Sequence, residues 1–208
     1  MADKFGISQL IDYLNQLGVR IANLDVHSET IELIFHGKHG KWRMILGFQQ
    51  HDEVRKLMLV VPQIGVVTTN KRLECLEALM AVNFRIAMGK FGMDLDDGEV
   101  RLEESLPLAT DSITKEQFRL AFVAMMQTVA VYSKLIPRIV DGNMTTQQAL
   151  QACEQEFFSQ AEVVQEVEAP QEMRLLPART TDGPETVPEL DVNDVLAEVA
   201  RILEGKKE

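Results

Sequence analysis

The chain has 208 residues, of which 46% are hydrophobic, so it is long and apolar enough for one ordinary domain with a core. Its formal charge is −11 at pH 7, which disfavours binding to nucleic acid or to an anionic membrane surface, because both need clustered Lys and Arg. Residues 161–208 hold 12 acidic and 5 basic residues, against 20 and 16 in residues 1–160, so most of the charge lies in the tail.

Cysteine usage and hydropathy indicate the compartment. Cys75 and Cys153 both fall in predicted helices, which favours two buried thiols over a disulfide framework. The first residues contain no secretory signal. The apolar stretch at 57–67 is interrupted by Pro62 and is too short to span a bilayer. We therefore expect a soluble, cytoplasmic protein.

The first half of the chain predicts a helix followed by strands. Apolar residues at helical spacing predict a helix over residues 7–17, which Gly18 ends. Residues 19–26 are compatible with an extended segment. Alternating apolar residues predict strands at 30–36 and 41–48, and the segment 55–61 is apolar on both faces, which is typical of a covered strand.

A second helix and a β-hairpin are predicted next. The helix is expected over residues 71–88, with Asn70 as its N-cap and Gly89 as its left-handed C-terminal cap. Its apolar residues at helical spacing are Leu73, Leu76, Leu79, Met80, Phe84 and Met88. Residues 91–95 and 100–106 alternate as two strands around a tight Asp97-Gly98 turn, and Pro107 ends the second strand.

The third helix is expected to begin at Thr114, where Gln117 completes a capping box, and Pro137 is expected to kink or end it. All seven residues from 120 to 126 are apolar, so this helix should be covered on more than one side. We predict that a second subunit supplies part of that cover; the alternative is cover by the first helix or by the tail. The candidate dimer or partner interface is Phe118, Phe122, Met125, Met126 and Val129.

The tail predicts a fourth helix, a linker and a last helix. Thr145 or Thr146 can cap a helix that runs to about residue 160. Its predicted apolar side is Ala149, Leu150, Cys153, Phe157 and Phe158. Residues 161–190 are acidic and contain four prolines, as in a flexible linker. Residues 191–205 predict an amphipathic helix. This helix could dock on another protein, dock on its own domain, or be a permanent structural part of the domain. The candidate docking residues are Val195, Leu196, Val199, Ile202 and Leu203.

Three short motifs resemble sites of known chemistry, and none predicts a catalytic, metal or cofactor site. His36 and His39 flank a turn without the further ligands that a metal needs. Residues 94–98 resemble a calcium loop, but the glycine and the glutamate do not fall at the required positions. Residues 89–92 lack the length of a phosphate loop, and no Ser lies in a nucleophile elbow. We expect a protein that is not an enzyme and that binds no cofactor.

The residues around the predicted hairpin resemble the YbjN-like family, which has the fold of the type III secretion chaperones. The similarity covers roughly residues 5–140, and it is carried by Asn83, Gly89-Lys90-Phe91, Asp94, Gly98-Glu99-Val100-Arg101 and Ser105-Leu106-Pro107-Leu108. The resemblance implies a small dimeric α+β domain that binds or regulates other proteins, and it implies no catalytic set.

The predicted fold is therefore α+β, with an antiparallel or mixed five-stranded sheet, elements in the order α-β-β-β-α-β-β-α, and a helical extension. We expect a domain over residues 1–142, an appended helix over 143–160, a linker over 161–190 and a last helix over 191–205. The predicted function is a chaperone-like or regulatory homodimer that binds segments of partner proteins through apolar surface. The alternative is a small-molecule-sensing regulator of signalling with its ligand site in the dimer.

Overall fold

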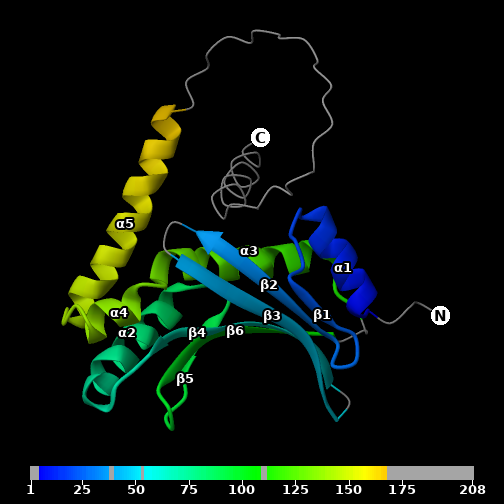
Figure 1. The fold of residues 1–208 in the computed structure, drawn as a ribbon, viewed down its shortest axis with the longest axis horizontal. Coiled ribbons are helices and arrows are strands. Elements are labelled where there is room, and N and C mark those ends of the chain that lie inside the picture. The colour runs from blue at the N-terminus through cyan, green and yellow to red at the C-terminus, as the bar shows by residue number, and fades with distance from the viewer. Residues whose placement is uncertain (1–4, 38–39, 53, 109–111, 168–208) are drawn as a thin grey trace, which may run out of the picture.

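The computed structural model describes residues 5–37, 40–52, 54–108 and 112–167, which form one curved sheet with helices around it (Figure 1). The sheet has six strands in the order β1-β2-β3-β4-β6-β5, and all neighbours are antiparallel. The strands are β1 Asn23–Asp25, β2 Thr30–Gly37, β3 Gly40–His51, β4 Val54–Val66, β5 Lys90–Met93 and β6 Glu99–Pro107. The helices are α1 Ile7–Gln16, α2 Arg72–Arg85, α3 Lys115–Tyr132, α4 Leu135–Val140 and α5 Thr146–Val167, with a 3₁₀ turn, η1 Thr69–Lys71, before α2.

The α+β class and the predicted order of the main elements are confirmed, and the sheet has one more strand than the five expected. The extra strand, β1, pairs with β2 in the segment that was compatible with an extended conformation. All three of its residues are exposed, so no apolar alternation identifies it in the sequence.

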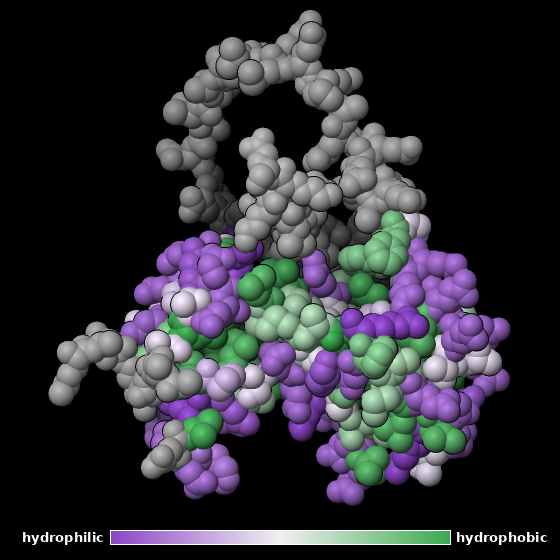
Figure 2. Space-filling view, turned by 180° about the vertical axis from the view of Figure 1, so that it is seen from behind, coloured by the Kyte–Doolittle hydropathy of each residue, from purple (hydrophilic) through white to green (hydrophobic). Residues whose placement is uncertain are grey.

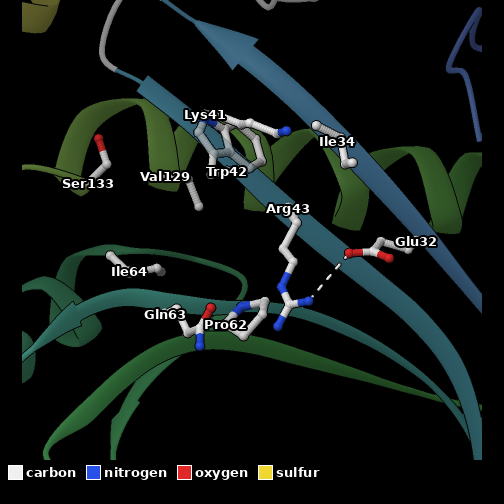
Figure 3. Close-up of a pocket in the computed structure, with 10 residues that line it drawn as sticks. All are labelled: Glu32, Ile34, Lys41, Trp42, Arg43, Pro62, Gln63, Ile64, Val129 and Ser133. Carbon is white, nitrogen blue, oxygen red and sulfur yellow. Dashed lines mark hydrogen bonds and ion pairs between the residues drawn. The ribbon is translucent and has the colours of Figure 1, made fainter. Parts of the chain in front are cut away.

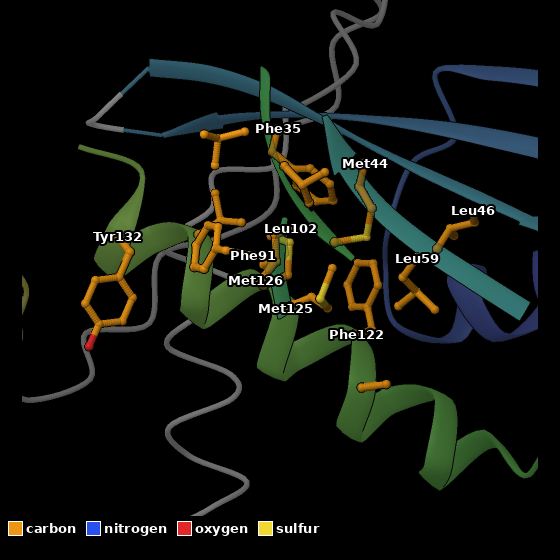
Figure 4. Packing of buried hydrophobic residues seen from close by; sticks show 14 of the residues in the cluster. Phe35, Met44, Leu46, Leu59, Phe91, Leu102, Phe122, Met125, Met126 and Tyr132 are labelled. Atoms are coloured by element: carbon orange, nitrogen blue, oxygen red, sulfur yellow. The ribbon is translucent and has the colours of Figure 1, made fainter. Parts of the chain in front are cut away.

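The hydrophobic core lies between the sheet and α3. Figure 4 shows Phe122, Met125 and Met126 of α3 facing side chains of the strands, among them Met44 of β3 and Leu59 of β4. Alternation along each strand delivers these residues to a single face, because successive side chains point to opposite sides. The same rule places Leu57, Leu59 and Val61 of β4 in the core.

Both ends of α3 are covered by other helices of the same chain. At its first turns, the ring of Phe118 lies 6.0 Å from the ring of Tyr13 in α1, and the Tyr13 hydroxyl donates to the backbone carbonyl of Ile113 at 3.1 Å. At its last turn, the Tyr132 hydroxyl donates to Glu154 of α5 at 3.0 Å. Cover from within the chain therefore accounts for the buried members of the apolar run at 120–126, whereas Leu120 is 52% exposed.

The prediction that this helix supplies the dimer or partner interface is wrong for Phe118, Phe122, Met125 and Met126, which are buried within the chain; Val129 is buried as well, but it lines the cavity described below. None of them is more than 1% exposed, because the sheet, α1 and α5 already cover them: Phe118, Phe122, Met125, Met126 and Val129. The apolar run indicated correctly that the helix is covered on more than one side. It could not indicate which part of the protein supplies the cover.

The second helix ends at Arg85, three residues before the predicted end, and Gly89 does not cap it. Ile86 is already extended, with ψ of 138°, and Lys90 closes the helix by donating its ammonium to the carbonyls of Asn83 and Ile86. Gly89 does have a positive φ, 76°, but a Cβ there would lie 2.7 Å from the sulfur of Met125. Close packing on α3 is thus a second reason for glycine at this position.

The start of α2 also differs from the expectation, since no side chain caps it and the turn η1 precedes it where Asn70 was expected to act as the cap. At α3 the prediction is confirmed. The Thr114 hydroxyl accepts from the amide of Gln117 at 3.2 Å, and the Gln117 side chain accepts from the amide of Thr114 at 2.9 Å. The helix then ends at Tyr132, and Pro137 lies in the first turn of α4, where its missing amide costs nothing.

The helix after Thr145 is longer than predicted, because α5 reaches Val167. Ala149, Leu150 and Cys153 are buried as expected, but Phe158 is 63% exposed. The start of α5 is tied to α2, since the Thr146 hydroxyl donates to the carbonyl of Glu74 at 3.0 Å. The appended helix is therefore packed against the domain.

The turn between β5 and β6 is longer than the two-residue turn predicted. The carbonyl of Asp94 accepts from the amide of Gly98 at 3.0 Å, and the carboxylates of Asp94 and Asp97 accept from the amides of Asp96 and Glu99. Gly98 has φ of 78°, and a Cβ on it would lie 2.2 Å from the carbonyl oxygen of Val67. The acidic residues here serve the turn, as the hairpin interpretation required.

We expect Gly98→Ala to lower the free energy of unfolding by about 2 kcal/mol, because the new side chain meets backbone in a left-handed conformation. Urea unfolding followed by circular dichroism measures the change. Gly92→Ala is the matched control in the same hairpin, since nothing lies within 4 Å of its Cβ position. Equal losses in the two variants would contradict the explanation.

Candidate functional site

The first candidate surface is the side of α2 that faces away from the core. Four large apolar side chains lie on it at helical spacing, and they are between 39% and 92% exposed: Leu73, Leu76, Met80 and Phe84. The opposite side of the same helix buries Cys75, Ala78, Leu79 and Val82. The helix is therefore apolar on two sides, and only one is covered within the described chain. We call the four exposed residues the α2 outer face.

The sequence places these four residues at helical spacing together with Leu79 and Met88, and it does not separate buried positions from exposed ones. The structure separates two stripes, one inward and one outward. The signal for this was present: a helix with one buried side rarely carries large apolar residues on both. Figure 2 shows hydrophobic atoms gathered over the part of the surface that α2 and the neighbouring hairpin form.

Polar contacts to β5 and α5 hold α2 in place. The side-chain amide of Asn83 donates to the carbonyl of Phe91 at 2.9 Å and accepts from its amide at 2.8 Å, which joins the end of α2 to β5. Arg85 pairs with Glu154 of α5, and Glu154 also accepts from Tyr132 of α3. These contacts fix the orientation of the helix and so keep the outer face turned toward solvent.

The second candidate is an opening in the sheet between β3 and β4. These strands pair from His51 opposite Val54 to Ile45 opposite Val60, and β4 pairs beyond that point only with β6. The opening holds a cavity of about 460 Å³. Its lining consists of Glu32, Ile34, Lys41, Trp42, Arg43, Pro62, Gln63, Ile64, Val129 and Ser133 (Figure 3). We call it the β3–β4 opening.

The chemistry of the opening is divided between its floor and its rim. Val129 of α3 and Ser133, which directly follows α3, lie on the side of the helices. Figure 3 shows Lys41, Arg43 and Glu32 projecting from β3 and β2. The guanidinium of Arg43 lies 3.4 Å from a carboxylate oxygen of Glu32. Sequence reasoning missed this site, although Pro62 inside an otherwise apolar strand is the residue that interrupts ladder pairing.

The described residues carry little that points to catalysis. They include no group of three or more His, Cys, Asp or Glu side chains placed to hold a metal ion. Burial raises the pKa of the Cys75 thiol and that of the Cys153 thiol, which opposes formation of a thiolate nucleophile. Arg138 donates to the Cys153 sulfur at 2.9 Å and counters part of that rise.

Within the described ranges of the chain, one helical segment, Lys115–Val140, is long and apolar enough to cross a membrane by length and composition alone. In the structure it is divided into α3 and α4, and half of its most apolar window is buried against the rest of the domain. Core packing thus accounts for its hydrophobicity. The five candidate residues of the docking helix, Val195, Leu196, Val199, Ile202 and Leu203, lie outside the described part of the chain, and their role stays a prediction.

Comparison with known proteins gives a family and a set of similar structures. A family model described as "YbjN: Putative bacterial sensory transduction regulator" matches residues 7–134, and no curated protein matches the chain. The solved structures that are similar include YbjN from E. coli, titled "a putative transcription regulator". It has 17% identity and a TM-score of 0.40, and the match covers 61% of this chain and 90% of that chain.

Two further similar structures are complexes of two proteins. The ExsC-ExsE complex has 17% identity and a TM-score of 0.44, with 62% of this chain and 92% of that chain covered. The HopA1-SchA chaperone-effector complex has 15% identity and a TM-score of 0.41, with 58% and 88% covered.

The contact between Tyr132 and Glu154 generates a pH prediction. Burial and the hydrogen bond to Glu154 raise the pKa of Tyr132 from 10.0 to about 12. A pKa raised by folding means that the neutral phenol contributes stability that is complete below pH 10 and is lost as the pH rises through 12. We expect the free energy of unfolding to fall between these values.

The Tyr132→Phe variant should be about 1 kcal/mol less stable near neutral pH, because Glu154 loses a donor. Its free energy of unfolding should also fall less steeply between pH 10 and 12. Urea unfolding at several alkaline pH values measures both effects. An equal slope in the variant and the parent chain would show that Tyr132 does not carry the alkaline loss.

Proposed function

Because the chain belongs to the YbjN family, described as regulators of bacterial sensory transduction, we propose that it is a regulatory, chaperone-like protein that acts by binding other proteins as a homodimer. The observation that carries the proposal is the α2 outer face, where large apolar side chains lie in solvent on a rigidly held helix. In this proposal the protein acts by binding, and no covalent bond is made or broken.

The α2 outer face suits a second copy of the chain. Exposed apolar patches of this kind mark interaction sites in soluble proteins. Its four residues are placed almost symmetrically about the middle of the helix, with Leu73 and Phe84 outside and Leu76 and Met80 inside. In an antiparallel pair related by a two-fold axis, Phe84 of one copy would therefore lie against Leu73 of the other. Such self-complementarity is what a two-fold interface requires.

Residues beside α2 can extend this contact toward the size of a stable interface, which buries about 1,200–2,000 Å² in total. Val66 at the end of β4 and Leu95 in the turn after β5 are both exposed by about 60%. An apolar centre surrounded by more polar surface is the usual anatomy of a protein interface.

Dimerisation through α2 would leave the sheet available to partner proteins. The β3–β4 opening is lined by β2, β3, β4 and α3, and it includes no residue of α2. The proposed homodimer would therefore present two such openings. Self-association and partner binding would use separate surfaces of the same protomer, which allows each to be tested by itself.

We expect the double variant Met80→Glu, Phe84→Glu to sediment as a monomer at micromolar concentrations at which the parent chain is a dimer. Burying two carboxylates in an apolar interface would cost more free energy of desolvation than the remaining contacts could offset. The variant should fold normally, because both positions are at least 69% exposed. Analytical ultracentrifugation gives the oligomeric state, and circular dichroism verifies the fold.

Leu120→Glu is the matched control for this experiment. Leu120 is an exposed apolar residue, 52% exposed, but it lies on α3 and outside the α2 outer face. It should leave the sedimentation of the dimer unchanged. A parent chain that is monomeric at micromolar concentration, or a double variant that remains dimeric, would refute the proposed interface.

A further inference from the structure

The β3–β4 opening exposes a strand edge inside the sheet. Residues 41–44 of β3 pair with β2 on one side, and the pairing of β3 with β4 begins only at Ile45. In an antiparallel strand, alternate residues direct their amide and carbonyl groups to opposite neighbours. Every second residue in this stretch of β3 therefore directs both backbone groups into the opening, where β4 does not meet them.

The facing part of β4 does not offer an equivalent edge. Pro62 has no amide, and the amide of Gln63 donates to the carboxylate of Glu99 at 3.0 Å. The register between β4 and β6 shifts between Val61 and Gly65, so the strand is irregular at this point. The opening thus has one regular hydrogen-bonding edge, on β3, and one irregular wall.

Side chains along β3 add a pattern to this edge. Trp42 and Met44 lie on the side of the core, and the ring of Trp42 stacks on Phe35 with the centroids 4.6 Å apart. Lys41 and Arg43 point to the other side and are exposed. The rim carries two cations and one carboxylate, Glu32, and Lys41 makes no ion pair within the described residues.

We propose that the β3–β4 opening binds a short extended segment of a partner protein, which adds a strand to the open edge of β3 and alternates apolar with acidic residues. Its apolar side chains would lie over Trp42 and the floor at Val129. Its carboxylates would lie on the outer side beside Lys41 and Arg43, because paired strands share one alternation of faces. This inference deepens the proposed function, since it names the kind of partner.

Such a ligand would pair with the open backbone edge of β3 and would also match the apolar floor and the charged rim of the opening. Added strands gain affinity from main-chain hydrogen bonds and specificity from the pockets that alternate side chains enter. A cavity of about 460 Å³ has the size of sites that bind small ligands, so it has room for a few residues. The net positive rim selects the acidic side chains.

The fluorescence of Trp42 provides the assay, because it is the only tryptophan of the chain and it lines the opening. The full chain is titrated with a short peptide that alternates valine and glutamate and is acetylated and amidated at its ends. We expect a saturable change in the emission of Trp42. The same peptide with alternate amides N-methylated, so that its donors are removed, should produce no saturable change.

The charge pattern is tested by a swap. Lys41→Glu, Arg43→Glu should lower the affinity for the valine–glutamate peptide about tenfold, because two attractive cross-strand pairs become repulsive. A valine–lysine peptide should bind this variant more tightly than it binds the parent chain. Lys56→Glu is the control, because Lys56 lies on β4 opposite Gln49 and Pro107, in the fully paired part of the sheet.

The proposal is overturned if the valine–glutamate peptide gives no saturable change, if the N-methylated peptide binds equally well, or if the charge swap fails to reverse the preference. Sedimentation of the same samples separates this result from the fate of the dimer. If the chain is a dimer and does not bind the peptide, only the proposed strand addition is refuted. If the chain is a monomer and binds the peptide, only the proposed α2 interface is refuted.

Discussion

The packing of α3 across the inner face of the sheet is the contact on which the rest of the protein depends. Phe122, Met125 and Met126 fill the space above the strands, and methionine suits this position because its unbranched side chain adapts to an irregular surface. Gly89 has no side chain where Met125 approaches, so β5 can begin close to the helix. Removing large side chains from such a core costs several kcal/mol each.

Once α3 occupies this face, the remaining helices have little sheet left to cover. Two of them pack at the ends of α3: α1 contacts Phe118, and α5 contacts Tyr132. The second helix is placed beside β5 and α5, where only one of its two apolar sides can be buried. The exposed apolar side of α2 is thus a consequence of how the core is filled.

Much of the fold could be predicted from the sequence, because it follows from periodicity and local chemistry. The capping box at Thr114 and the hairpin around Gly98 depend on residues within a few positions of each other. The capping box is confirmed, and the hairpin forms as predicted but with a longer turn. The length of α2 was predicted wrongly because the contacts that Lys90 makes at its end have no periodic signature in the sequence. The role of Gly89 was predicted incompletely because Met125, which packs on it, is distant in the sequence. The predicted interface on α3 was wrong because apolar spacing identifies a covered helix but does not identify what covers it.

The double contact between Asn83 and Phe91 has a mechanical consequence. It fastens the last turn of α2 to β5, and the contact between Gly98 and Val67 fastens the hairpin turn to the segment that leads into the helix. The helix and the hairpin are therefore connected at two points, one at each end of α2. A displacement of α2 would therefore strain both contacts and act directly on β5 and on the turn that precedes β6.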